Sequence, residues 1–325
     1  PKLTKSQFKD QQIDFLSKFC GLSKCRRPFV LLKNNSTFSL DAFNRKKVSL
    51  TQVKGVFLEG SRCVDIPITP IWNIFPSLCY WLGLLIAEGR ISHGVNFYNN
   101  DKTLLKQFTT LSKRIFGLSS TEIEGGLNLR STSLVIFLRK VFGLSGKQHS
   151  RDKIIPQIIL KSSKKSIASL LSGLYDGEAH VSVKDGTIEF STASKDIASK
   201  IPYLLLRFGI RSRVREKFSQ ATNSPNPKKR KYFRIWICGE NNLRIFNKEI
   251  GFKNPQKISS MKRYLSKKRE QNTNVDVYPL SKIIRGIRHT LRLSSTRKKN
   301  FNLSIDIYEN GYRNPSRKSL CEITN

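Results

Sequence analysis

The sequence predicts an α+β protein made of two pseudo-symmetric units, each with the element order αββαββα and antiparallel strands. The same succession of helix and hairpin signals occurs twice along the chain. A glycine and a glutamate recur at a common offset of 90 residues, from Gly83 to Gly173 and from Glu88 to Glu178. With 325 residues, of which 38% are hydrophobic, the chain can bury a sizeable core. The expected regions are a small basic N-terminal region (1–72), a first unit (73–150), a second unit (151–255) and a helical C-terminal extension (256–325).

The first unit is expected to open with a helix at Pro76, because proline suits the first turn of a helix. This helix should end at Glu88 and Gly89, where the glycine can adopt the left-handed conformation that closes many helices. The remaining expected elements are a hairpin around His93-Gly94, a helix over 101–116 closed by Gly117, a hairpin around Gly125-Gly126 and a helix over 132–142 closed by Gly143.

The second unit repeats this order. Its expected elements are a helix over 165–176, a hairpin at Asp185-Gly186, a helix over 196–208 closed by Gly209, two strands, and a helix over 240–250 closed by Gly251. The first 70 residues are weakly periodic and predict only short strands. The C-terminal extension predicts helices over 281–293 and 304–309 and a last helix opening at Pro315, an arrangement similar to a helix-turn-helix module.

The charge of the chain predicts a polyanionic partner. There are 59 Lys and Arg residues against 23 Asp and Glu residues, a formal net charge of +36, so nucleic acid is the first candidate. We expect no membrane partner, because no long uninterrupted apolar stretch occurs. The six cysteines form no CxxC pair and no secretory leader is evident at Pro1, which favours an intracellular protein, cytoplasmic in a prokaryotic or archaeal host, with an organelle also possible.

Small residues and acids follow one pattern in the first helix of each unit. Small residues four positions apart share a helix face, so the two helices can approach closely. If they pair, Glu88 and Glu178 emerge together at helix C-termini, where the helix dipole disfavours a carboxylate by about 0.3–1 kcal/mol. One such glutamate would be a solvated helix end, but two in register favour a divalent-metal site, since oxygen ligands suit Mg²⁺. The paired small residues are Gly83 with Ala87 and Gly173 with Gly177.

The segments 81–89 and 171–179 resemble the paired motif of LAGLIDADG homing endonucleases, and the element order resembles that family's unit over residues 75–255. The resemblance implies two saddle-shaped antiparallel sheets on DNA. It also implies that Glu88 and Glu178 bind Mg²⁺ or Mn²⁺ and are catalytic in phosphodiester hydrolysis, without a covalent enzyme intermediate.

The chain departs from the family pattern at three kinds of position. Ile86 and Ala179 replace the first aspartate and the final glycine of the motif, and glutamate stands where aspartate is commoner at the metal position. Asp176 fills the first acidic position of the second motif and is interpreted as a structural residue that caps or hydrogen bonds. The family also implies a basic side chain near the metals, for which Lys231, at the head of a predicted strand, is the candidate catalytic lysine.

Basic residues that alternate along a predicted strand point to one face of a sheet. With so basic a chain, contact with DNA is favoured over a merely solvated face. The residues of this row are Arg211, Arg213, Arg215 and Lys217, and the other candidate DNA-binding residues are Arg90, His180, Lys229 and Arg234.

The predicted function is site-specific double-strand cleavage of DNA by a monomer that recognises a long asymmetric target, with one strand cut by each unit. The C-terminal extension resembles that of some archaeal intein-type homing endonucleases, so intein or intron mobility is expected. We expect no self-splicing, since the chain begins at Pro1 and ends at Thr324-Asn325. Two alternatives stay open: an RNA maturase of the same family, and a non-catalytic DNA-binding regulator, against which the paired acids argue because they would repel phosphate.

Overall fold

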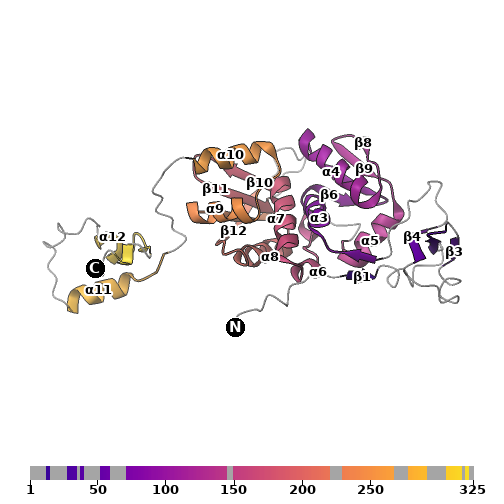
Figure 1. Ribbon diagram of the computed structural model, residues 1–325. Coiled ribbons are helices and arrows are strands. Elements are labelled where there is room, and N and C mark those ends of the chain that lie inside the picture. Colours follow the sequence, from indigo (N-terminus) through magenta and orange to yellow (C-terminus); the bar gives the residue numbers. More distant parts are fainter. Residues whose placement is uncertain are drawn as a thin grey trace.

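The fold comes from a computed structural model, which describes residues 12–14, 28–34, 37–39, 52–58, 71–144, 149–219, 229–266, 277–290, 305–316 and 319–321. Its central body contains two four-stranded antiparallel sheets and a pair of helices that lie side by side between them (Figure 1). This arrangement confirms the predicted α+β class and the two pseudo-symmetric units.

The first unit follows the predicted order. Its elements are α3 (Pro76–Glu88), β6 (Gly89–Ile91), β7 (Val95–Tyr98), α4 (Lys102–Phe116), β8 (Thr121–Ile123), β9 (Gly126–Leu129) and α5 (Thr132–Phe142). The strands form one antiparallel sheet in the order β6-β7-β9-β8. Side-chain caps begin the later helices, as where Asp101 accepts a 2.8 Å hydrogen bond from the Thr103 backbone N–H. Gly117 (φ 72°) and Gly143 (φ 68°) close α4 and α5 in the left-handed conformation, as predicted.

The predicted left-handed closure of α3 at Gly89 is wrong. Gly89 has φ −94° and ψ 161°, an extended conformation, because the chain passes from α3 directly into β6. A glycine is still favoured there, since an ideal Cβ would lie 2.3 Å from the carbonyl oxygen of Leu85.

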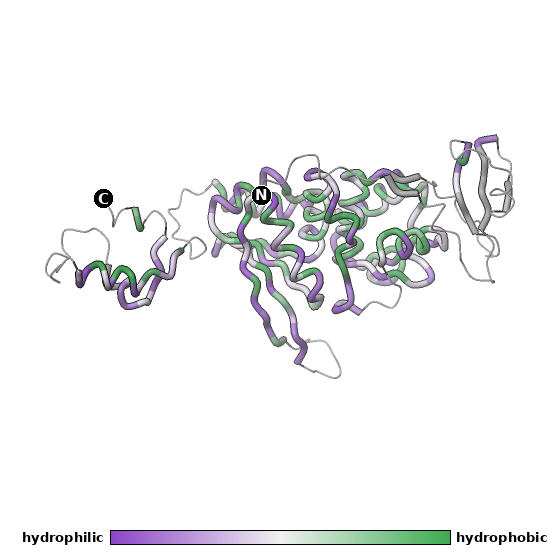
Figure 2. Tube along the Cα trace, turned by 90° about the horizontal axis from the view of Figure 1, so that it is seen from below, coloured by the Kyte–Doolittle hydropathy of each residue, from purple (hydrophilic) through white to green (hydrophobic). Residues whose placement is uncertain are grey.

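The second unit repeats the first. Its elements are α7 (Lys164–Glu178), β10 (Ala179–Ser182), β11 (Thr187–Thr192), α8 (Lys195–Leu206), β12 (Arg213–Ser219), β13 (Arg230–Cys238) and α9 (Glu240–Glu249), preceded by a short 3-10 helix η3 (Ser150–Asp152) and α6 (Gln157–Leu160). The sheet order β10-β11-β13-β12 matches that of the first unit element by element. The long β12–β13 hairpin projects from the body, as Figure 2 shows from below.

A helix that the sequence analysis did not identify follows the second unit. α10 (Pro255–Leu265) contacts β10 and α9, so it belongs with the second unit by its packing. The expected boundary between residues 255 and 256 therefore divides one helix. The missed signal was Asn254 before Pro255, an N-cap followed by a proline in the first turn.

The core lies between the sheets and the central helices. α3 is buried on nearly all sides, from Leu78 to Ala87. Trp81 stacks on Phe108 with ring centroids 5.1 Å apart, and its indole N–H donates to the Ser112 hydroxyl at 2.9 Å. Hydrophobic segments accordingly gather inside the body in Figure 2.

The two ends of the chain form smaller elements. The described strands of the N-terminal region are β1 (Gln12–Asp14), β2 (Pro28–Leu32), β3 (Thr37–Ser39), β4 (Val53–Leu58) and β5 (Ile71–Asn73), which form a β1-β5 pair and a β3-β2-β4 sheet. Near the C-terminus, α11 (Ser281–Thr290) packs on α12 (Ile305–Glu309), and residues 319–321 are helical. Among the described residues, no helix combines the length and apolar character that crossing a bilayer requires.

Candidate metal and nucleic-acid site

The two central helices approach each other through glycine backbones. An ideal Cβ at Gly83 would lie 2.3 Å from the Leu170 carbonyl oxygen, and one at Gly173 would lie 2.3 Å from the Tyr80 carbonyl oxygen. Residues 80 and 170 are separated by the same offset as the two glycines, so the contacts are related by a pseudo-twofold axis. One turn further along, an ideal Cβ at Gly177 would lie 2.5 Å from the Cβ of Ala87. The predicted close pairing of α3 and α7 is confirmed.

Both motif glutamates stand at the ends of this helix pair. α3 ends at Glu88 and α7 ends at Glu178. The pKa of Glu88 is raised because the surrounding protein displaces water from the carboxylate. The same cause, with the nearby charge of Glu88 second, raises the pKa of Glu178 to about 7. Glu178 nevertheless keeps an exposed surface, so solvent screens part of this effect.

Two lysines face the glutamates. Lys153 lies in the segment that joins the two units, and its ammonium donates a hydrogen bond to the carbonyl oxygen of Ala87 in α3. Lys257 lies in the first turn of α10, and its ammonium donates to the carbonyl oxygens of Tyr175 (2.8 Å) and Asp176 (2.6 Å) in α7. Each cation thus offsets the negative end of one helix dipole.

These lysines also interact with the paired carboxylates. Lys153 and Lys257 both act to lower the pKa of Glu88 and of Glu178 against the raising effect of burial. Burial in turn lowers the pKa of each lysine. The result is a compact group of two acids and two bases at the centre of the molecule.

The structure does not bring Lys231 to this group. Strand alternation places Lys231 on the same face of β13 as the buried Ile235 and Ile237, and it pairs with Glu216 at 2.7 Å. Lys231 remains untested as the catalytic lysine, and the structure adds Lys153 and Lys257, whose charges act on both glutamates, as further candidates. The sequence analysis did not identify either lysine, because both lie outside the two motif helices and reach the glutamates only through the tertiary fold.

The donor set suits a hard divalent cation shared with a phosphate. In the part of the chain that the structure describes, no cluster of three or more His, Cys, Asp and Glu side chains forms a closed metal cage. Glu88 and Glu178 instead offer one carboxylate each. This agrees with Mg²⁺, which proteins usually hold through one or two carboxylates together with water and substrate phosphate oxygens.

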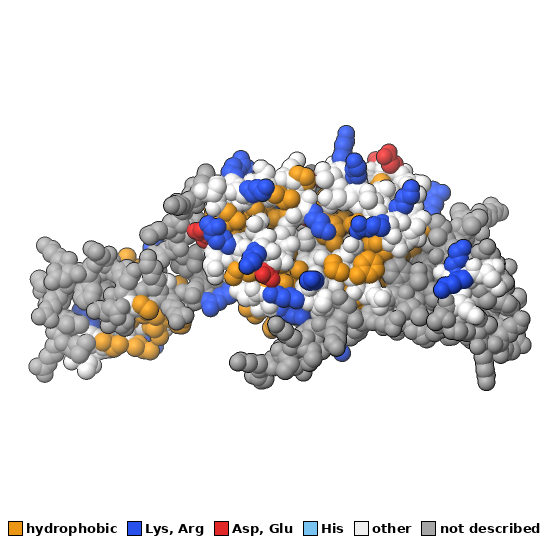
Figure 3. Space-filling view, viewed as in Figure 1, with side chains coloured by type: hydrophobic (Ala, Val, Ile, Leu, Met, Phe, Trp, Pro, Cys, Tyr) orange, Lys and Arg blue, Asp and Glu red, His pale blue; other side chains and the backbone are white. Residues whose placement is uncertain are grey.

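The second sheet has a basic outer face. Arg213, Arg215 and Lys217 alternate along β12 and point away from the core, as predicted. Arg211 was expected in the same row, but β12 begins at Arg213, and Arg211 lies just before the strand, where its backbone N–H donates to Asn242. Lys and Arg side chains are also spread over the face of the body shown in Figure 3, where acids are few.

Side chains on this outer face are held in place by one acid. The Glu189 carboxylate on β11 pairs with Arg234 at 3.0 Å and accepts from the Trp236 indole at 2.9 Å. The Arg215 guanidinium lies 6.0 Å from the Trp236 ring centroid. Arg215 has no ion-pair partner among the described residues. The Arg215 guanidinium, which lies over the Trp236 ring, is therefore available to contact a ligand.

The remaining predicted DNA contacts are exposed. His180 lies opposite Glu189 on β10, and Lys229 directly precedes β13. Arg90 lies on the outer face of β6, paired with Asn96 of β7. Asn128 of β9 donates a hydrogen bond to Asn96, so the outer face of the first sheet carries two amides beside Arg90.

Comparison with known families covers the second unit. Residues 165–251 match the family model described as LAGLIDADG-like domain. The chain carries a LAGLIDADG-like domain. The matched residues include the second motif segment, 171–179, and agree with the resemblance seen there. The matched range runs from α7 to the end of α9, and the first unit corresponds to it through the internal repeat.

Three curated archaeal proteins contain a segment similar to this LAGLIDADG-like chain. The chain is 32% identical over 265 residues to the replication factor C small subunit of Methanocaldococcus jannaschii, covering 76% of the chain and 13% of that protein. It is 28% identical over 262 residues to the probable translation initiation factor IF-2 of the same organism, covering 78% of the chain and 21% of that protein. It is 27% identical over 232 residues to the probable translation initiation factor IF-2 of Thermococcus kodakarensis, covering 69% of the chain and 18% of that protein. The chain thus spans about a fifth or less of these relatives.

Solved structures similar to the chain include the homing endonuclease I-DmoI in complex with DNA and Ca, with a TM-score of 0.42 and 12% identity over 59% of this chain and 99% of that chain. I-DmoI in complex with DNA and Mn has a TM-score of 0.41 and 14% identity over 55% of this chain and 98% of that chain. Full-length WhiA from Thermatoga maritima is also similar, with a TM-score of 0.40 and 11% identity over 72% of this chain and 77% of that chain.

We predict that divalent cations stabilise this protein more at about pH 8 than at about pH 5.5. A carboxylate whose pKa is raised from 4.5 to about 7 in the folded protein stabilises it most below pH 4.5, and this stability is lost as the pH rises through 7. Cations bind the ionised form, so they should reverse that loss, by about 2.7 kcal/mol at 100 times the dissociation constant.

Thermal unfolding in MgCl₂ and in EDTA at both pH values measures this difference. The Glu88→Gln/Glu178→Gln double variant is the control and should show little shift. An equal stabilisation by cations at both pH values would contradict the prediction.

Proposed function

We propose that the chain is a site-specific double-strand DNA endonuclease that hydrolyses phosphodiesters with divalent metals. The observation that carries the proposal is the group of two carboxylates and two lysines at the C-terminal ends of the paired helices α3 and α7. A duplex has the same approximate twofold symmetry as this helix pair, so such a centre can serve two scissile phosphates, one in each strand.

The residues divide the chemistry between them. Glu88 and Glu178 would hold Mg²⁺ or Mn²⁺, which stabilises charge on the attacking and leaving oxygens of a phosphate. Lys153 and Lys257 would place a second positive charge beside each phosphate, where negative charge builds up during displacement. All four groups are prearranged, so little reorganisation is needed when DNA binds.

The two sheets support a long and asymmetric DNA target. The outer face of the second sheet carries several arginines and Trp236, whereas the first presents Arg90 beside Asn96 and Asn128. Arginine favours guanine and asparagine favours adenine in the major groove. We infer that a monomer suffices, since the two units already provide two half-sites.

The relatives support a mobile element rather than a replication or translation component. Their names describe different cellular tasks, yet each shares with the chain a segment of similar length. A segment common to proteins of unrelated function is best explained as an insert with its own activity, as in intein or intron mobility.

Cleavage of a randomised duplex library with Mg²⁺, followed by sequencing of the cut ends, tests the proposal. We expect double-strand cuts within one long, asymmetric sequence. Binding to duplex without cutting under varied metals would favour a DNA-binding regulator, and preferential binding of intron RNA over duplex would favour a maturase.

Binding should be strongly salt dependent. Neutralising about eight phosphates gives a slope of log K against log[salt] near −7, so affinity should fall by about 10⁴ between 50 and 200 mM salt. Fluorescence anisotropy with labelled duplex measures the slope. A flat profile would contradict a phosphate-contacting interface.

Arg215→Ala should relax base preference at one position and weaken binding of the selected site by about 10-fold or more, the usual worth of a bidentate arginine–guanine contact. The matched control is Arg244→Ala, which removes the same charge from α9, where Arg244 pairs with Glu240. If Arg215 contacts phosphate instead, binding will weaken equally on all sequences and base preference will not change.

A further inference from the structure

Asp176 is a buried acid that does not face the metal site. Its side chain is fully buried in α7, and both carboxylate oxygens are used. Oδ1 accepts from the Asn254 backbone N–H at 3.1 Å, and Oδ2 accepts from the Lys253 backbone N–H at 2.9 Å. The Tyr80 hydroxyl of α3 also donates to Oδ2 at 2.8 Å. Asp176 therefore ties the segment before α10 to both central helices.

This contact fixes the start of α10. Asn254 is the N-cap of the helix, and its side chain accepts from the backbone N–H groups of Gln256 (3.0 Å) and Lys257 (3.2 Å). It also donates to Asp101 Oδ2 at 2.5 Å, which fastens it to the first unit. Lys257 lies in the first turn of α10, and its ammonium donates hydrogen bonds to the carbonyl oxygens of Tyr175 and Asp176. The position of Lys257 thus depends on Asp176.

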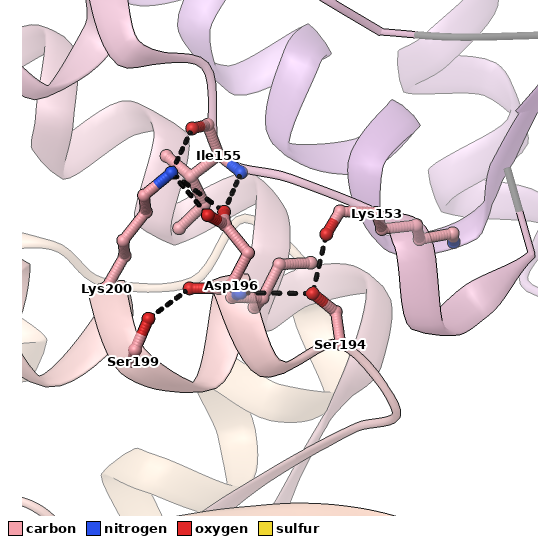
Figure 4. Close-up of polar contacts among 7 residues, drawn as sticks. Lys153, Ile155, Ser194, Asp196, Ser199 and Lys200 are labelled. Carbon is pink, nitrogen blue, oxygen red and sulfur yellow. Dashed lines mark hydrogen bonds and ion pairs between the residues drawn. The ribbon is translucent and has the colours of Figure 1, made fainter.

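Lys153 is held by a different set of contacts. The Ser194 hydroxyl donates to the carbonyl oxygen of Lys153 at 2.5 Å, and Asp196 Oδ2 accepts from the Ile155 backbone N–H at 2.9 Å (Figure 4). Lys200 pairs with Asp196 and donates to the Ile155 carbonyl oxygen at 3.0 Å. Ser194, the N-cap of α8 (Lys195–Leu206), and Asp196 and Lys200 within it thus orient the joining segment so that the Lys153 side chain reaches α3.

The two anchors are not copies of one another. The residue that corresponds to Asp176 in the first repeat is Ile86, which has no polar side chain. The two glutamates are related by the repeat, but the contacts that hold the two lysines are not, so one lysine can be displaced without the other.

We propose that Asp176 and Asp196 are separate positioning residues, Asp176 for Lys257 and Asp196 for Lys153, so that each controls cleavage of one DNA strand. The inference rests on the proposed endonuclease function. A displacement of about 1 Å in a catalytic group can slow a reaction about 10²-fold. Loss of one anchor should therefore leave a strand-specific nicking enzyme.

The experiment compares Asp176→Ile, which installs the residue found at position 86, with Asp196→Ala on a duplex labelled differently on its two strands. We expect Asp176→Ile to slow one strand about 10²-fold and the other no more than about 3-fold, and Asp196→Ala to show the opposite strand preference. Asp176→Asn, which keeps one acceptor oxygen, should partly restore the slow strand. Equal slowing of both strands by every variant would overturn the proposal, because general destabilisation does not distinguish the strands.

A second readout does not depend on cleavage. An amine-reactive ester, followed by mass spectrometry of the full chain, should label Lys257 faster in Asp176→Ile and in Asp176→Asn, with Lys153 unchanged. In Asp196→Ala, Lys153 should be labelled faster and Lys257 should be labelled at the wild-type rate. Unchanged Lys257 labelling in both Asp176 variants would overturn the positioning role. If wild type labels as expected but cuts no DNA, the endonuclease proposal fails while the two anchors stand.

Discussion

Glu88→Gln and Glu178→Gln should each reduce double-strand cleavage by about 10³-fold or more while DNA binding survives. Each substitution removes one of the two carboxylates available to a shared divalent cation, and the stabilisation such a cation gives is worth several kcal/mol. Glutamine keeps the size and hydrogen-bonding capacity of the side chain, so the end of each helix can remain intact. Cleavage rates on a selected duplex, with binding measured in EDTA, separate the two effects.

The stability of the glutamine variants provides the control. Because the surrounding protein and the charge of Glu88 raise the pKa of Glu178, ionisation of the pair opposes folding at alkaline pH. Each variant should therefore unfold at a temperature equal to or above that of wild type at about pH 8 without metal. A variant that still cuts both strands at the wild-type rate would show that its glutamate is not needed for the reaction.

Much of the fold could be predicted because its signals are local. Helix starts carry capping side chains such as Asp101, and helix ends carry glycines such as Gly117, so the order of elements followed from sequence alone. The repeat then gave the symmetry, since Gly83 and Gly173 lie at one offset. The conformation of Gly89 does not follow from the helix that it ends, because its extended backbone depends on the strand that comes next.

The sequence predicts the two glutamates of the candidate site but not its two lysines. Glu88 and Glu178 belong to the helices that pair, so their meeting follows from helix geometry. Lys153 and Lys257 arrive from other segments through tertiary hydrogen bonds that leave no pattern in the sequence. Lys231 lies an odd number of positions from Arg234 on β13, so strand alternation places the two side chains on opposite faces of the sheet.

Gly173→Ala should destabilise the protein by about 3 kcal/mol, although alanine favours helices. In an open helix the same change stabilises by about 0.5–1 kcal/mol. At position 173 the new methyl group would lie 2.3 Å from the Tyr80 carbonyl oxygen and 3.0 Å from the Leu84 nitrogen. These are backbone atoms, so the clash is relieved only if α3 and α7 move apart, and overpacking of this kind typically costs about 1–3 kcal/mol or more.

Separation of the helices should also disturb the proposed metal site. Glu88 and Glu178 terminate the helices that move, so cleavage and stabilisation by cations should decline together with stability. The matched control is Gly286→Ala in α11. There, among the described residues, no atom beyond the chain neighbours and the helix's own backbone lies within 4 Å of the new methyl group, so stability should stay the same or rise. Thermal unfolding of the two variants beside wild type decides the point. An unchanged unfolding temperature for Gly173→Ala would mean that the central helices do not approach through their backbones, and the pairing of the glutamates would lose its structural basis.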